Sequence, residues 1–166
     1  ASAISNSTLE HIADPQAVLR EVARVLRPGA PFMFCVPSER FLSFLGVSGW
    51  LRRCRLVSLG SVYERFFNRV SRHLHYDPPT VWKHRLKVAG FNLEWYRYYV
   101  SRRALQALEY GHYLGAPALV TKAITGRWII SPTYANLWLT EKIVRRYYDE
   151  PLPEIGAYLF FVARKI

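Results

Sequence analysis

The clearest hydrophobic pattern of the chain predicts a helix followed directly by a buried strand. Asp14 is a suitable N-cap, and Pro15 fits the first helical position, where a missing N–H costs nothing. The apolar residues of this helix share one face: Val18, Leu19, Val22, Val25 and Leu26. After a stop at Pro28 and Gly29, residues 31–36 are all apolar, which is typical of a strand covered on both faces in a parallel sheet, although a buried helical turn has the same pattern. We expect a β-α-β step of an α/β domain.

Weaker patterns predict one more helix and two more strands. Residues 80–89 carry apolar side chains at helical spacing and precede a glycine. In residues 91–100 apolar and polar positions alternate as far as Trp95, which indicates a strand with one less buried face, and Arg97 breaks this alternation. The apolar run 157–165 predicts a last strand near the C-terminus.

The segment LEHIADPQAVLREVARVLRPGAPFMFCVPS, residues 9–38, closely resembles class I S-adenosylmethionine-dependent methyltransferases of the type 11 kind. The residues that fit the family pattern are Leu9, Glu10, His11, Asp14, Pro15, Leu19, Arg24, Val25, Leu26, Pro28 and Gly29. Ala30 stands where a second glycine is common, and residues 80–91 show a weaker resemblance. The resemblance implies the C-terminal half of a Rossmann-like methyltransferase sheet, strands four to seven, with the last strand antiparallel and with helical insertions.

The glycine-rich cofactor loop of such methyltransferases has no counterpart in this sequence. The nine glycines are scattered, and none form GxGxG. Residues 1–6 have the pattern of a strand end, and the chain begins with Ala1 rather than Met, so we expect residues 1–166 to be a partial methyltransferase domain from a longer protein. In the family, the missing half supplies the glycine turn and the acidic residue that holds the cofactor ribose. We therefore expect this piece alone to be inactive.

Composition is compatible with one globular unit in a reducing cytoplasm. With 166 residues, of which 51% are hydrophobic, the chain can bury a sizeable core. Its two cysteines indicate neither a disulfide framework nor a metal cluster. The formal net charge of +11 favours polyanionic partners, but no nucleic-acid-binding module is recognisable, so we expect no nucleic acid partner.

Residues 41–75 form a basic amphipathic insertion. Its arginines, opposed by the single acid Glu64, are Arg52, Arg53, Arg55, Arg65, Arg69 and Arg72. Three interpretations stay open: a helical cap with solvated arginines, a nucleic-acid contact, and a segment that lies in an anionic membrane interface through Arg52, Arg53, Arg55, Arg65 and Arg69. Aromatic and aliphatic residues between the arginines suit an interface better than a phosphate track. We expect a cytoplasmic protein that can lie peripherally on the inner face of a membrane.

Residues 101–154 are expected to form a second, mostly helical cap insertion. The chain has 5 Trp and 11 Tyr, which favours an aromatic-walled pocket, although most such residues lie in protein cores. We take Glu10, Trp50, Tyr76 and Trp82 as the candidate acceptor contacts.

The resemblance also indicates where the chemistry takes place. It puts Ser5, Asn6 and Ser7 beside the cofactor, S-adenosylmethionine, and Glu10 with His11 near the mouth of the acceptor pocket. Methyl transfer is an in-line displacement that depends on alignment in a dry pocket, and a hydroxyl acceptor needs a base. His11 is our candidate for this catalytic base. Alternatively, Ser7 and Glu10 form a capping box and His11 only contacts a helix end.

We expect no metal. Some quinone-modifying relatives bind a divalent cation through ExxEH at this place, but Ser7 stands at the first position here, so the pair of carboxylates is lacking. The other histidines, His73 among them, lack ligand spacing and have the character of surface or packing residues.

These features together favour a methyltransferase that acts on a hydrophobic or lipid-like small molecule. The alternative is a non-catalytic methyltransferase-like module that binds a membrane surface or a partner through its basic aromatic cap.

Overall fold

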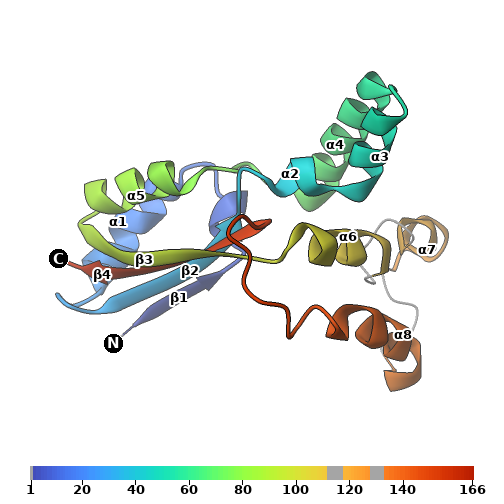
Figure 1. Cartoon of the computed structure of the whole chain (residues 1–166). Coiled ribbons are helices and arrows are strands. Elements are labelled where there is room, and N and C mark those ends of the chain that lie inside the picture. Colours follow the sequence, from blue (N-terminus) through green and yellow to red (C-terminus); the bar gives the residue numbers. More distant parts are fainter. Residues whose placement is uncertain (1, 112–117, 128–132) are drawn as a thin grey trace.

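The structure, a computed structural model, describes residues 2–111, 118–127 and 133–166. A four-stranded sheet carries helices on one face, and further helices lie beyond one end of its strands (Figure 1). The strands are β1 (Ala3–Asn6), β2 (Pro31–Pro37), β3 (Phe91–Tyr99) and β4 (Tyr158–Lys165).

The order of the strands in the sheet is β1-β2-β4-β3. β1 and β2 run parallel, whereas β4 runs antiparallel to both of its neighbours. The last strand of the chain therefore inserts into the sheet in reverse direction. This topology confirms the predicted α/β fold with an antiparallel last strand.

The core lies between the sheet and helices α1 (Pro15–Val25) and α5 (Pro79–Val88), which cover the same face (Figure 1). The Asp14 carboxylate accepts a hydrogen bond of 3.0 Å from the Ala17 N–H, as expected of an N-cap. Fully buried side chains from both layers meet here: Leu19, Phe34, Trp82, Leu86 and Phe161. Both helices start within one residue of the predicted position.

The opposite face of the sheet is less covered than its sequence predicts. Met33 and Phe160, which point away from the core, are only half-buried. None of the described helices lies over this face (Figure 1). On this face of β2, Met33 is half-buried but Cys35 is buried, so the prediction that β2 is covered on both faces is met only in part within the described residues.

A β-bulge in β3 changes which of its side chains face the core. Pairing with β4 is regular as far as Leu93 and resumes at Trp95 with a shift, so that Glu94 is an additional residue. Such a bulge displaces the in-and-out alternation by one position. Trp95, predicted on the same face as Leu93, instead contacts Phe160 on the other face, and Tyr96 turns to the core side.

The two predicted insertions are mostly helical within the described residues. Their helices are α2 (Phe41–Phe44), α3 (Gly46–Arg53), α4 (Val57–Ser71), α6 (Arg102–Gly111), α7 (Ala118–Thr125) and α8 (Tyr134–Arg145). Helices α3 and α4 form a hairpin that projects from the rest of the molecule (Figure 1). Within the described ranges, no helix has both the length and the apolar character needed to cross a bilayer.

Glu109 joins the two helical segments. Its side chain is only 3% exposed. Its carboxylate accepts hydrogen bonds from the Gly46 and Val47 N–H groups at the start of α3, and from the Tyr63 hydroxyl of α4 at 2.6 Å. A carboxylate is well placed at a helix N-terminus, where unpaired N–H groups and the helix dipole favour negative charge. Helix α6 is thereby tied to the α3–α4 hairpin.

Candidate active site at the carboxyl end of the sheet

The carboxyl ends of β1 and β2 meet at one edge of the sheet, the edge at which open α/β sheets bind ligands. The turn after β1 is attached to β2, because the Ser7 N–H donates to the Cys35 carbonyl at 3.2 Å and the Cys35 thiol donates to Asn6 Oδ1 at 2.6 Å. Ser7 has a left-handed backbone, with φ of 48°. Ser5 is half-buried in β1, whereas Asn6 and Ser7 are exposed at its end.

Glu10 is buried at this edge of the sheet. It lies in a short 3-10 helix, η1 (Leu9–His11), which begins after Thr8. Its side chain is 0% exposed, and neither carboxylate oxygen has a partner among the described residues. Burial raises the pKa of the Glu10 carboxyl. The alternative of a capping box between Ser7 and Glu10 is not observed, because Ser7 has a left-handed backbone and the Glu10 side chain is buried.

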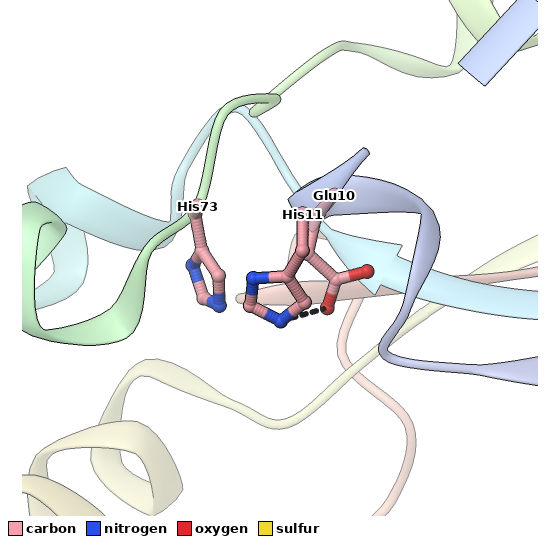
Figure 2. A group of neighbouring side chains, drawn as sticks. All are labelled: Glu10, His11 and His73. Atoms are coloured by element: carbon pink, nitrogen blue, oxygen red, sulfur yellow. Dashed lines mark ion pairs between the residues drawn. The ribbon is translucent and has the colours of Figure 1, made fainter. Parts of the chain in front are cut away.

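Two histidines stand beside Glu10 (Figure 2). His11 Nε2 lies 3.9 Å from Glu10 Oε1, and its Nδ1 lies 3.0 Å from the Arg72 carbonyl oxygen. The ring of His73 is centred 4.9 Å from that of His11. Burial, and then the neighbouring His11, lower the pKa of His73 to about 4, so His73 is neutral at pH 7.

The segment that carries His73 is fastened to η1 by its backbone and by a neighbouring histidine. The Leu74 N–H donates to the Glu10 carbonyl at 2.7 Å, and His75 Nε2 lies 2.9 Å from the Ile12 carbonyl oxygen. Residues far apart in sequence are thus held together by hydrogen bonds that do not involve the Glu10 carboxylate.

Aromatic side chains line the same edge. Phe41 is in ring contact with His73, Tyr76 and Tyr158, and Tyr158 is in ring contact with Tyr99. Burial raises the pKa of Tyr76 to about 12, and burial together with the nearby Glu10 raises the pKa of Tyr158 as well. Near neutral pH these phenols are protonated and can donate hydrogen bonds.

An apolar cavity of about 410 Å³ shares Tyr99 with this edge. Its wall is formed by α6, α8 and the segment before β4, with Ala104, Leu108, Val144 and Pro151 among the lining residues. The volume lies in the range of small-molecule sites.

The structure brings some of the predicted site residues together and leaves others elsewhere. Glu10, His11 and Tyr76 lie at this edge, next to the turn of Asn6 and Ser7. The two predicted tryptophans do not join them: Trp50 is 61% exposed on α3, and Trp82 is fully buried in the core between Phe34 and Phe161. Contact of either tryptophan with an acceptor stays a prediction.

Sequence reasoning missed His73, Tyr99 and Tyr158. Tyr99 ends β3 and Tyr158 begins β4, and the two are paired in the sheet. Since the first residue of an antiparallel strand lies at the carboxyl edge of its parallel neighbours, the expected reversal of the last strand was a usable signal for Tyr158. His73 lies outside regular structure, and no spacing in the sequence indicated it.

A family model described as a methyltransferase domain matches residues 2–95, more than half of the 166 residues. No curated protein sequence matches the chain.

Three solved structures resemble the chain in fold. The [4+2]-cyclase SpnF gives a TM-score of 0.52 at 17% identity, covering 99% of this chain and 48% of SpnF. A complex of the Haloferax volcanii Trm112 methyltransferase activator with a putative methyltransferase gives a TM-score of 0.47 at 15% identity, and the match covers 99% of this chain and 53% of that one. The putative methyltransferase BH2331 from Bacillus halodurans C-125 gives a TM-score of 0.43 at 14% identity, and the match covers 99% of this chain and 68% of BH2331. The chain spans about half the length of the first two.

Proposed function

The chain belongs to the methyltransferase domain family, and we propose that the protein transfers a methyl group from S-adenosylmethionine to a hydrophobic or lipid-like small molecule. One observation carries this proposal: Glu10, His11 and the phenols of Tyr76 and Tyr158 gather at the carboxyl edge of the sheet, and an apolar cavity lies next to them. The fold by itself leaves the reaction open, because it is shared with a [4+2]-cyclase.

Residues at the end of β1 fit one end of this cofactor. Asn6 and Ser7 are exposed at the carboxyl end of a parallel strand, in a turn that hydrogen bonds to Cys35 hold against β2. The aromatic rings of Tyr76, Tyr99 and Tyr158 suit a neighbouring cation. When bound, the cofactor supplies a methyl group on a positively charged sulfur. The glycine-rich turn for its other end has no counterpart in this sequence.

The apolar cavity beside Tyr99 supports a hydrophobic acceptor. Its apolar lining side chains can hold an acyl or ring system by burial alone. The Tyr158 hydroxyl can donate a hydrogen bond that orients a polar head of the acceptor.

His11 is the proposed base for a hydroxyl acceptor. The Arg72 carbonyl can only accept, so it fixes the proton of His11 on Nδ1 and leaves the Nε2 lone pair available. The carboxylate of Glu10, 3.9 Å from Nε2, would stabilise the imidazolium that forms.

The test uses the full-length protein with methyl-labelled S-adenosylmethionine and a lipid extract. We expect label in the organic phase, and a rate about 10²–10⁴-fold lower for His11→Gln. His84→Gln, at an exposed position on α5, is the matched control and should retain the wild-type rate. If calorimetric titration with S-adenosylmethionine gives no heat at high protein concentration, the methyltransferase proposal is wrong.

We also propose that the α3–α4 hairpin contacts an anionic membrane surface. Leu59, Val62, Phe66 and Val70 recur on one face of α4 and are 51%, 50%, 45% and 40% exposed. Arg65 and Arg69 flank this stripe and are exposed as well. An apolar stripe bordered by arginines is suited to the boundary between headgroups and acyl chains.

This contact would place a cytoplasmic protein peripherally on the inner face of the membrane, close to a lipid-like acceptor. It also supports the alternative function, a non-catalytic module that binds the membrane through its basic aromatic cap. The labelled-methyl assay separates the two functions, because only the enzyme labels a lipid.

A further inference from the structure

We propose that Glu10, His11 and His73 form a binding site for a divalent transition metal ion, with zinc as the best match. Each of the three side chains offers one ligand atom, and these atoms lie within 4.8 Å of one another. Figure 2 shows the carboxylate and the two imidazole rings grouped together, from η1 and from the loop after α4. This inference goes beyond the proposed methyl transfer and does not depend on it.

The hydrogen bonds of both imidazoles prepare them as metal ligands. His11 Nδ1 faces the Arg72 carbonyl oxygen at 3.0 Å, so Nδ1 carries the proton and Nε2 has a lone pair. His73 Nδ1 lies 3.1 Å from the Tyr76 hydroxyl oxygen. The Tyr76 proton is already donated to Asn68 Oδ1 at 2.7 Å, so His73 Nδ1 donates and its Nε2 is also free to bind. Metal-binding histidines are typically oriented by such second contacts.

Glu10 supplies the strongest evidence for a bound cation. A carboxylate that is 0% exposed, with no partner for either oxygen among the described residues, is costly, since buried polar groups are normally hydrogen-bonded and buried charges paired. A divalent ion held between Glu10 and the two neutral rings would compensate this charge.

The ligand set and its spacing fit zinc. Two histidines and one carboxylate, with a further position open, are typical of catalytic zinc sites. In a tetrahedral site with bonds of about 2.0–2.1 Å, ligand atoms lie about 3.4 Å apart. His11 Nε2 and Glu10 Oε1 are 3.9 Å apart, so small side-chain rotations suffice. The His11 side chain is 39% exposed and has room to adjust.

A metal here would change the role of His11. Its Nε2 is the one ring nitrogen left by the bond to Arg72, so it cannot both bind a metal and take a proton. In the proposed methyltransferase, an acceptor hydroxyl bound at the open position would instead lose its proton more easily because of the metal charge. This consequence rests on the proposed function, whereas metal binding itself does not.

The test is a titration of the untagged full-length protein with Co²⁺ after treatment with EDTA. We expect one Co²⁺ per chain, the visible absorption of a low-symmetry site, and displacement by Zn²⁺. Glu10→Gln and His73→Gln should each weaken binding by at least about 100-fold, and Tyr76→Phe, which keeps all three ligands, by about 10–100-fold. The matched control, His84→Gln, should bind like the wild type.

Two results would overturn the inference: a wild-type protein that binds no Co²⁺, or Glu10→Gln and His73→Gln variants with wild-type affinity. If a ligand variant does not fold, as judged by circular dichroism, Tyr76→Phe decides. The titration contains neither S-adenosylmethionine nor acceptor. A protein that binds metal but transfers no methyl group therefore refutes only the proposed function, and an active protein that binds no metal refutes only the metal site.

Discussion

Gly156 lies where the chain approaches the end of β3 before it enters β4. A Cβ atom at this position would lie 2.5 Å from the Tyr99 carbonyl oxygen and 3.0 Å from the Tyr99 carbonyl carbon. The obstacle is backbone within a paired strand, so it cannot move without disturbing the sheet. We expect Gly156→Ala to lower the free energy of unfolding by about 1–3 kcal/mol, measured by urea denaturation of the full-length protein.

Gly49→Ala is the matched control for this substitution. Its added Cβ would meet the Arg102 Nη2 atom at 3.3 Å, which belongs to a flexible side chain. Because Gly49 lies inside α3, alanine should be neutral or stabilising there, by up to about 1 kcal/mol. Equal stability of the two variants would contradict the close approach at Gly156.

The sequence indicated Glu10 and His11 but not the partner that faces them. Both residues lie in the segment that resembles methyltransferases, so their neighbourhood could be predicted. His73 lies beside them because its neighbours Leu74 and His75 form hydrogen bonds with the backbone of Glu10 and Ile12. Such contacts between residues far apart in sequence leave no local pattern. The alternative of a capping box between Ser7 and Glu10 was wrong for a local reason, the left-handed backbone of Ser7.

At the scale of elements, the hydrogen bonds of Glu109 lead to a prediction about how α6 and the α3–α4 hairpin are held together. Glu109→Gln removes the negative charge from the start of α3 and weakens the hydrogen bonds from Gly46, Val47 and Tyr63. Hydrogen bonds to a charged group contribute about 1.5–3 kcal/mol. We expect a loss of unfolding free energy of that size, and faster amide hydrogen exchange in α3 and α4.

Glu141→Gln provides the comparison for Glu109→Gln. The Glu141 side chain is 51% exposed and faces only Arg145, at 3.8 Å, among the interactions described for it. Exposed pairs of this kind contribute little, so its stability should stay within about 0.5 kcal/mol of the wild type. If Glu109→Gln leaves hydrogen exchange in α3 and α4 unchanged, Glu109 does not join the two segments.

Helices were easier to predict from this sequence than the pairing of strands. Asp14 and Pro15 are local signals for the start of α1, which begins at the expected residue, and Gly90 is one for the end of α5, which ends within one residue of expectation. The bulge at Glu94 depends on how β3 pairs with β4, which the alternation within one strand cannot express. The side chains after the bulge were accordingly assigned to the wrong faces.

At the scale of the whole molecule, the resemblance contributed what periodicity could not. The reversed direction of β4 was implied by the family likeness alone, and the pairing with β2 and β3 confirms it. The hairpin of α3 and α4 had no such guide. Its mixture of arginines and apolar residues allowed several interpretations, and only the structure separates the residues that pack inward, such as Phe67, from those that face out.

The exposed face of the α3–α4 hairpin leads to a prediction about membrane binding. Arg53, Arg55, Arg65 and Arg69 are exposed, whereas Arg52 is paired with Glu64 at 2.9 Å and is better left intact because it holds α3 to α4. A cation near an anionic surface contributes about 1 kcal/mol, so replacing these four arginines by Glu should weaken flotation with phosphatidylserine vesicles by more than about 100-fold. The control reverses the same number of exposed charges on α1, just after α1 and on α5: Arg20, Arg27, Lys83 and Lys87. Equal flotation of both variants would show that binding follows net charge and not this hairpin, whereas loss confined to the hairpin variant assigns the membrane contact to α3 and α4.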